Sequence, residues 1–562
     1  MIESTSTLED AEILRLLSGD EPPTGEMMND LSLRIKEAVR SCCIDVHNFI
    51  RIARGNGQNT PAPVCDARSP GEFAIGHIPG ALNLPLFSDN ERAIVGTMYS
   101  EKGRSSATVA GMAFVQPKLD FLVSTAADIV SRASSATEDG DGDGNGDGDG
   151  DNDSDINNSI IDDIEQFPVL LLHCWRGGMR SCALAFLIQI RIPGLRVYVL
   201  EGGYKSFRKW QYSIYCYLSQ NANYDTSYDE NHDKRKKKNF SKKKRLKFET
   251  KKAAASGIGI AKREAAIAKV RATQQLENAT DMAAAKSQWK AEVKASALAE
   301  KEWDLMFAHG PRIIILGGPT GSGKTKVLHA LRDILGEQII DLEGLANHSG
   351  SAFGFVGHEP QPTPQQYTND VAMQWASLDP ERLVFIEDEG PNVGRVNLPV
   401  GLYRKMRTAS VVLKLDIPRD IRVQVLREDY ALPEKENDDD DDDTNQHDLS
   451  EWLIQMIEAT RSLEKRIGFV RKNTMINLLR DGDYGEFASL ALEYYDDLYH
   501  KHITNEHGSA NMNKAGKRAA TISTVTVDNM KHFHAETVAR QVLITMQTII
   551  NGTNNTREIH PR

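Results

Sequence analysis

The stretch RIIILGGPTGSGKTKVLHALRDIL, residues 312–335, decides the fold of the second half of the chain. Its apolar start predicts a buried strand, and the apolar positions at helical spacing after the loop predict a helix. Between them, residues 318–325 match G-x-x-x-x-G-K-[ST] in the strand–loop–helix context that this motif requires. Such a loop turns its backbone amides toward a di- or triphosphate. The sequence therefore predicts a phosphate-binding loop (P-loop) in an α/β domain with a parallel sheet.

A metal-binding role is expected beside this loop. Lys324 is expected to neutralise the bound phosphates, and the Thr325 hydroxyl to hold Mg²⁺. The apolar run that begins at residue 383 ends in three acidic residues, Glu387, Asp388 and Glu389, of which Asp388 is the preferred Mg²⁺ ligand. No pattern identifies a base that would activate water. The residues expected to bind phosphate are Gly318, Gly321, Ser322, Gly323, Lys324 and Thr325.

The first half of the chain repeats this pattern in VLLLHCWRGGMRSCALAFLIQI, residues 169–190. Cys174 follows an apolar run that predicts a strand, and a helix is expected from Ser181 onward. Two glycines allow the backbone N–H groups to turn inward, and a helix N-terminus stabilises an anion there. Such surroundings favour a thiolate nucleophile, whereas the alternative is a buried structural cysteine. The expected anion cradle around Cys174 is Trp175, Arg176, Gly177, Gly178, Met179 and Arg180.

The length of 562 residues corresponds to two or three domains plus linkers. Apolar runs bounded by turns and alternating with helical patterns predict that both main domains are α/β, each with a parallel sheet. Segments of low complexity are expected to be solvated insertions. The expected divisions are an N-terminal extension at 1–39, a first domain at 40–219 with an acidic insertion at 131–163, a basic and helical linker at 220–305, a P-loop domain at 306–500 with an acidic insertion at 434–448, and a C-terminal tail at 501–562.

Charge is distributed unevenly along the chain. The net charge is −12, from 67 Lys and Arg against 79 Asp and Glu, yet residues 234–252 hold twelve basic residues and one acid. This run fits an arm that grips a polyanion, a nuclear-localisation-like patch or a solvated linker. No apolar run approaches the roughly 18 residues of a membrane span, so an integral membrane protein is not expected. The first residues lack a signal-peptide pattern, and we expect a cytoplasmic location, with a nuclear one as the alternative.

Two families match the residues around Cys174. The pattern His173-Cys174-x5-Arg180-Ser181 matches the short signature of cysteine-dependent phosphatases. The stretches DARSPGEF at residues 66–73 and GHIPGALNLP at residues 76–85 resemble the rhodanese domain. This second resemblance implies a loop cysteine that carries sulfur or selenium, with the Asp and Arg of DARSPGEF as scaffold groups. The loop is one residue longer than a common rhodanese loop, which implies a larger anion than thiosulfate.

Further motifs occur together and in order in one family, the tRNA 2-selenouridine synthases. They are LPLFSDNERAIVGT at residues 84–97, EGGYK at 201–205, DLEGLANHSGSAFG at 341–354 and EDEG at 387–390. The chain resembles this family over about residues 60–130, 165–215 and 310–500. The insertions and the tail have no counterpart in the compact plan of the family.

The resemblance implies a rhodanese-like domain fused to a P-loop domain in a transferase that acts on tRNA. Such enzymes replace the sulfur of wobble 2-thiouridine by selenium from selenophosphate, through an S-geranylated intermediate made with geranyl diphosphate. By this resemblance Cys174 is the catalytic cysteine of selenium transfer, and Glu343 is a further site residue. The P-loop would hold either the prenyl diphosphate or a nucleotide. The expected partners are tRNA and the enzyme that produces selenophosphate.

Two other functions remain open at this stage. One is a cysteine-dependent phosphatase fused to a P-loop domain, which would release phosphate from phosphopeptides or phosphosugars. The other is a non-catalytic adaptor that carries sulfur or binds tRNA and leaves the base unchanged.

Overall fold

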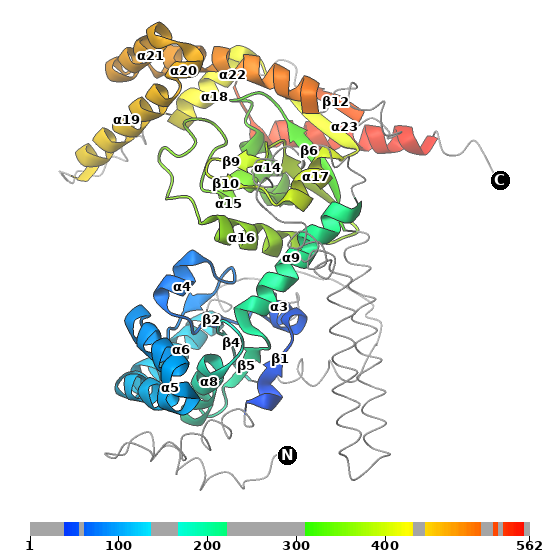
Figure 1. Ribbon diagram of the computed structural model, residues 1–562. Helices are drawn as coiled ribbons and strands as arrows, with labels where there is room; N and C mark the ends of the chain where they lie inside the picture. Colours follow the sequence, from blue (N-terminus) through cyan, green and yellow to red (C-terminus); the bar gives the residue numbers. More distant parts are fainter. Residues whose placement is uncertain are drawn as a thin grey trace, which may run out of the picture. The chain divides into compact units, whose positions relative to one another are not determined.

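The computed structural model describes residues 39–55, 61–135, 167–221, 310–430, 444–506, 521–526 and 532–555. The chain divides into two compact units, Met1–Gln211 and Tyr212–Arg562 (Figure 1). Most of the expected N-terminal extension, of the acidic insertion at 131–163 and of the linker at 220–305 lies outside the described residues. The part of the acidic insertion at 434–443 also lies outside them, whereas its last residues begin a helix.

The first unit is built on a five-stranded sheet in which every pair of neighbours is parallel. The strand order is β1-β5-β4-β2-β3. The strands are β1 (Cys43–Ile44), β2 (Val64–Asp66), β3 (Leu82–Asn83), β4 (Val169–His173) and β5 (Arg196–Leu200). The α-helices are α3 (Val46–Arg54), α4 (Pro70–Ile75), α5 (Asp89–Val115), α6 (Leu119–Ser135), α8 (Met179–Arg191) and α9 (Gly203–Asn221), which continues past the end of the unit. Short 3₁₀ turns occupy Arg40–Cys42 and Gln116–Lys118.

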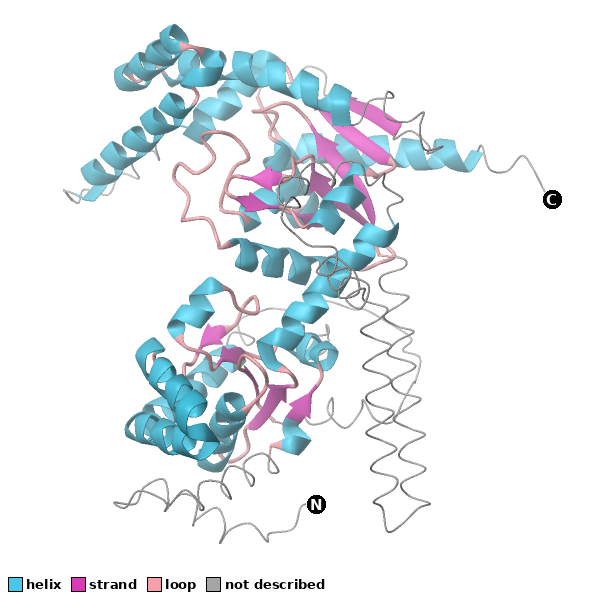
Figure 2. Ribbon diagram, viewed as in Figure 1, coloured by secondary structure: helices cyan, strands magenta, loops and turns pink. Residues whose placement is uncertain are grey.

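Strand β4 is buried along its whole length, as expected for a central strand of a parallel sheet with helices on both faces (Figure 2). Leu170 and Leu172 of β4 pack with Val197 and Val199 of β5 in one core with helices α5, α6 and α8. Side chains alternate between the two faces of a strand, so only every second residue can reach this core. Helix α8 begins at Met179, two residues before the expected start at Ser181.

The second unit has its own five-stranded parallel sheet, with strand order β12-β11-β6-β8-β7. Its strands are β6 (Arg312–Gly317), β7 (Gln338–Ile340), β8 (Leu383–Glu387), β11 (Val411–Asp416) and β12 (Thr521–Thr526), and β9 (Asn392–Val393) pairs antiparallel with β10 (Val396–Asn397). The helices are α14 (Lys324–Asp333), α15 (Leu342–Leu345), α16 (Pro364–Ala376), α17 (Val400–Arg407), α18 (Arg419–Tyr430), α19 (Thr444–Ser462), α20 (Glu464–Ile467), α21 (Phe469–Asp481), α22 (Tyr484–Glu506) and α23 (Ala535–Asn555). The two parallel sheets confirm the predicted α/β class. Among the described residues, no helix is both long and apolar enough to cross a membrane.

The structure differs from the sequence-based division at residue 500, because much of the expected C-terminal tail belongs to the P-loop domain. Strand β12 pairs with β11 over six residues. Val525 of β12 and Val538, Val542 and Met546 of α23 are buried in the core that also contains the P-loop strand and helix. The long polar interval before β12 conceals this strand in the sequence, since its partner β11 lies about a hundred residues earlier.

Shortening a buried side chain of α23 should therefore destabilise the second unit. We expect Met546→Ala to lower the free energy of unfolding by about 2–5 kcal/mol, since Met546 is only 4% exposed. Ile544→Ala is the matched control on the same helix, because Ile544 is 58% exposed and its loss should change stability by less than about 0.5 kcal/mol. Equal denaturation midpoints for the two variants would show that α23 is not part of the core.

Candidate functional site

The loop after β4 places Cys174 against the N-terminus of α8. Its sulfur accepts hydrogen bonds from the backbone N–H of Gly178 at 3.4 Å and from the Ser181 hydroxyl at 3.2 Å. Cys174 is nearly buried, with 3% exposure. Two donors and the N-terminus of a helix therefore meet at one sulfur. This geometry can hold a sulfur nucleophile with a small anion beside it.

A second glycine turn, directly after β5, supports the cysteine loop. Gly177 and Gly203 both have φ of +60°, a conformation that glycine adopts without strain. A Cβ atom on Gly203 would collide with the carbonyl oxygen of Cys174, so the two turns are in direct contact. The N–H of Tyr204 donates to that carbonyl at 2.7 Å, and the N–H of Lys205 donates to the Trp175 carbonyl at 3.0 Å. The motif EGGYK is thus the support of the cysteine loop.

Asp66 and Arg68 form a buried ion pair beneath the loop. The Arg68 Nε donates to Asp66 Oδ2 at 2.9 Å, and its Nη2 donates to the Gly76 carbonyl at 2.7 Å. The Arg68 guanidinium also lies 4.0 Å from the centre of the Tyr204 ring. Burial lowers the pKa of His173, which lies between these groups and the cysteine, to about 4, so its ring is neutral at neutral pH. These contacts agree with a scaffold role for Asp66 and Arg68.

The basic residues of the expected cradle lie differently from what the spacing predicts. Arg180 donates to Glu72 Oε2 at 2.7 Å, and the Nε of Arg92 lies 3.1 Å from the same oxygen. The donors that reach the Cys174 sulfur are the Gly178 amide and the Ser181 hydroxyl. Ser181 belongs to the phosphatase-like signature, but its contact with the sulfur is not predicted from the sequence; it is the third residue of the helix that follows the cysteine. The other cradle residues are arranged around the loop, with Trp175 and Arg176 exposed and Gly177, Gly178 and Met179 partly buried.

In the second unit the predicted P-loop connects β6 to α14. Gly321 and Gly323 have φ of +75° and +69°, and Lys324 begins the helix and donates to the Gly318 carbonyl at 3.2 Å. Ser322 is fully buried. The glycine conformations and the helix start are what a phosphate-binding turn requires.

Two residues that the sequence did not single out support the P-loop. Arg422 of α18 donates from Nε to the Thr320 carbonyl at 3.0 Å and from Nη2 to Asp496 at 2.5 Å. Phe533, just before α23, lies so close to Gly323 that a Cβ atom there would collide with its ring. Neither residue is near the loop in sequence, so no local pattern could have indicated them.

Three carboxylates, one buried and two half-buried, gather beside the P-loop. Glu343 of α15, Glu387 at the end of β8 and Glu389 can bring one oxygen each within 4.8 Å of one another. The Thr325 hydroxyl donates to Glu343 at 3.2 Å, and neither oxygen of Glu387 has a hydrogen-bond partner among the described residues. Burial first, and then repulsion from a neighbouring carboxylate, raises the pKa of Glu343 and of Glu387 to about 8, and that of Glu389 to about 7. Oxygen donors of this kind fit Mg²⁺.

The preference for Asp388 as the Mg²⁺ ligand is a point on which the structure disagrees. The Nη2 of Arg407 donates to Asp388 Oδ1 at 2.6 Å, and both side chains are buried. Successive residues of an extended chain point to opposite sides, so Glu387 and Glu389 face the P-loop together while Asp388 faces away. Glu387 and Glu389, the two alternatives to Asp388, are therefore the carboxylates that lie near Thr325 and Glu343.

The fold and the two loops define a class: a protein of two parallel-sheet units, one with a cysteine loop and one with a P-loop. Residues 311–530 match the family model described as the tRNA 2-selenouridine synthase AAA domain. This match includes β12, in agreement with its place in the sheet.

Curated relatives extend the likeness to the first unit. A tRNA 2-selenouridine synthase of Sulfurovum sp. (strain NBC37-1) is 28% identical over 453 residues, which are 78% of this chain and 87% of that protein. The protein of the same name from Nitrosomonas europaea is 25% identical over 66% of this chain and 64% of its own length. The one from Hydrogenovibrio crunogenus is 26% identical over 78% of this chain and 88% of its own length. The chain is thus a relative of the tRNA 2-selenouridine synthases, and the resemblance seen in its motifs is confirmed.

One solved structure also matches part of the chain. It is an N-terminal domain from Clostridium difficile 630, 26% identical, covering 30% of this chain and 97% of its own. Its TM-score of 0.22 is too low to support an argument about the fold.

Because the carboxylate cluster holds protons at neutral pH, Mg²⁺ must displace them in order to bind. We expect the affinity for Mg²⁺ to rise between pH 6 and pH 9, as groups with pKa values of about 7 to 8 ionise. Glu387→Gln should weaken the binding at least tenfold, whereas Glu381→Gln, at an exposed position, should leave it unchanged. Titration calorimetry across this pH range measures the effect. An affinity independent of pH and of Glu387 would place the metal elsewhere.

Proposed function

We propose that the chain is a tRNA-modifying transferase that converts wobble 2-thiouridine to 2-selenouridine with selenophosphate as the selenium donor. The observation that supports this most directly is the pair of donors on the Cys174 sulfur, in a chain whose curated relatives are named tRNA 2-selenouridine synthase. The first unit is, in this proposal, a rhodanese-like domain. Its partners are tRNA and the enzyme that supplies selenophosphate.

The reaction proceeds in two transfer steps, followed by a hydrolysis, in this proposal. The sulfur of 2-thiouridine attacks C1 of geranyl diphosphate, so that a C–S bond forms, the C–O bond breaks and diphosphate leaves. The selenium of selenophosphate then attacks C2 of the base, a C–Se bond forms, the C–S bond breaks and the geranylthiol leaves. Transfer of the phosphoryl group to water frees 2-selenouridine. Neither step needs an oxidant or a reductant.

Cys174 acts in the exchange of sulfur for selenium. The Gly178 amide and the Ser181 hydroxyl stabilise negative charge on its sulfur, and the same helix N-terminus favours the anionic donor. The buried Asp66–Arg68 pair and the turn at Gly203 position the loop without touching the sulfur.

The P-loop binds a phosphate ligand in the second unit. Lys324 lies at the start of α14, where it can neutralise phosphate charge. Thr325, Glu343, Glu387 and Glu389 would hold Mg²⁺, which when bound screens the charge between phosphate oxygens.

The phosphatase alternative is less well supported by the contacts. A cysteine phosphatase needs the arginine of its signature beside the cysteine sulfur, but here the donors to the Cys174 sulfur are Gly178 and Ser181, and Arg180 lines the neighbouring cavity. The adaptor alternative predicts tRNA binding with no change in the base, and the experiment below separates it from the transferase.

Replacement of Cys174 by Ser should abolish selenation without preventing geranylation. The measurement is mass spectrometry of nucleosides from 2-thiouridine tRNA incubated with geranyl diphosphate and selenophosphate. The intact protein should yield 2-selenouridine, the Cys174→Ser variant only the geranylated base, and the control Cys43→Ser the same product as the intact protein, since Cys43 is exposed. Selenation by Cys174→Ser would refute the role of this cysteine. Unmodified tRNA in all samples, despite binding, would favour the adaptor.

The Ser181 hydroxyl, which donates a hydrogen bond to the Cys174 sulfur, should affect the rate of selenation in the same assay. We expect Ser181→Ala to slow selenation about tenfold, since a hydrogen bond to a charged group contributes about 1.5–3 kcal/mol. Ser181→Thr keeps the hydroxyl and should retain most of the rate. A rate unchanged by Ser181→Ala would show that the sulfur does not need this donor.

A further inference from the structure

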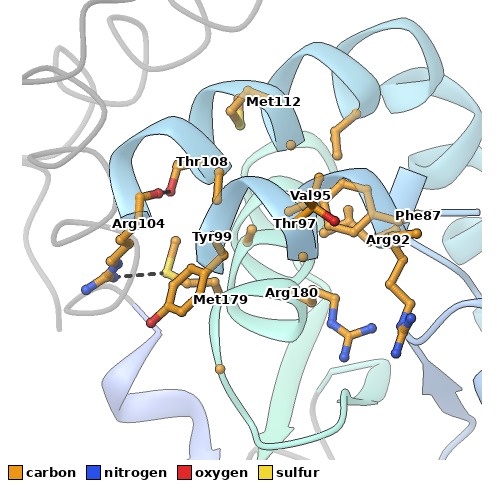
Figure 3. Close-up of a pocket in the computed structure, with 18 of the residues that line it drawn as sticks. Phe87, Arg92, Val95, Thr97, Tyr99, Arg104, Thr108, Met112, Met179 and Arg180 are labelled. Atoms are coloured by element: carbon orange, nitrogen blue, oxygen red, sulfur yellow. Dashed lines mark hydrogen bonds between the residues drawn. The ribbon is translucent and has the colours of Figure 1, made fainter. Parts of the chain in front are cut away.

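A cavity of about 760 Å³ lies in the first unit between α5 and the first half of α8 (Figure 3). Its size is within the range of about 300–1,000 Å³ that is usual for small-molecule sites. The residues that line it come from the segment 86–115 and from residues 178–187. Its walls are largely apolar, and the residues that form the apolar part include Leu86, Phe87, Val95, Met112, Val115 and Leu187.

A break in α5 shapes this cavity. Gly103 has φ of +81° and is not helical, so the chain bends there within the long helix. Residues on both sides of the bend line the cavity, Tyr99 before it and Thr108 after it. A straight helix could not wrap around the cavity in this way.

The cavity adjoins the cysteine loop. Gly178, Met179 and Arg180 contribute to its wall. Gly178 is also the residue whose amide donates to the Cys174 sulfur. The cavity and the cysteine thus share the first residues of α8.

The charged residues of the cavity are all basic. Among the described residues that line it, three are arginines, Arg92, Arg104 and Arg180, and none is acidic. Figure 3 shows Arg92 and Arg180 at one end, and both contact the same oxygen of Glu72, with distances of 3.1 and 2.7 Å. One carboxylate faces two guanidinium groups, so a positive charge remains at this end. The site suits a ligand with an apolar body and an anionic head.

We infer that this cavity binds the prenyl donor, with the isoprenoid chain between α5 and α8 and the diphosphate at Arg92 and Arg180. The inference rests on the proposed function, in which the tRNA sulfur attacks C1 of geranyl diphosphate. As the C1–O bond breaks, its electron pair leaves with the diphosphate, and the two guanidinium groups stabilise that charge. The C–S bond then forms beside the loop that carries Cys174. The P-loop of the second unit is left for a different phosphate ligand.

Binding of geranyl diphosphate to the full chain, measured by titration calorimetry, tests the site. Arg92→Gln should weaken the binding at least about tenfold, because a charge-assisted hydrogen bond to phosphate is lost. Lys102→Gln removes the same charge from the same helix at an exposed position outside the cavity and should have no effect. Ala183→Phe should block the apolar part, since Ala183 lines the cavity. Inorganic diphosphate should bind much more weakly than geranyl diphosphate to the unaltered chain.

Activity assays separate this inference from the proposed function. The cavity variants should lose geranylation of 2-thiouridine tRNA, yet convert tRNA that already carries the S-geranyl group to 2-selenouridine at the normal rate. If the unaltered chain geranylates tRNA and both cavity variants match it, or if Lys324→Ala alone abolishes binding of geranyl diphosphate, the inference is overturned and the proposed function stands. If the unaltered chain neither binds geranyl diphosphate nor geranylates tRNA, the geranyl step of the proposed function fails. If circular dichroism shows that the Ala183→Phe variant is unfolded, the result for Arg92→Gln alone tests the inference.

Discussion

The contact between two glycine turns at the carboxyl end of the first sheet determines where Cys174 lies. Strands β4 and β5 are parallel neighbours, so the turns that follow them meet at the same edge. Gly177 and Gly203 leave no room for a Cβ atom between the turns. The carbonyl of Cys174 is thereby tied to the N–H of Tyr204, and the sulfur is left to face the start of α8. Any larger residue at these glycines would move the loop away from its donors.

The same property of parallel sheets builds the site of the second unit. Leu316 of β6 is in register with Glu387 of β8, so the P-loop and the acidic turn leave the sheet side by side. Three carboxylates then share a space with little water, and their raised pKa values are the consequence. Buried charge of this kind is costly unless a proton or a cation compensates for it. In the proposed function, Mg²⁺ held by these carboxylates compensates for that charge.

The two units therefore offer anions two different environments. The P-loop provides backbone amides, one lysine and a cluster of oxygen ligands, which suit a compact and highly charged phosphate. The cavity of the first unit provides apolar walls with arginines, which suit an amphipathic anion. The proposed reaction, which combines a prenyl diphosphate with a second phosphate compound, would use both environments.

The local motifs could be predicted because each one is a short strand, a turn and a helix that lie together in the chain. Cys174, Lys324, Thr325 and the parallel sheets follow from such patterns. The choice between Asp388 and its neighbours could not be predicted, since Arg407, which binds Asp388, lies on another element. Glu343 came from a family resemblance, and its contact with Thr325 became visible only in the fold.

The sequence by itself thus determined the α/β class, the cysteine loop and the P-loop, since these depend on backbone preferences over a few consecutive residues. Only the tertiary structure decided the partner of Arg180, the inclusion of β12 and α23 in the second core, and the cavity between α5 and α8. Each of these joins residues that are far apart in the chain. Their contacts depend on how helices pack on a sheet, and no short pattern of residue types records that packing.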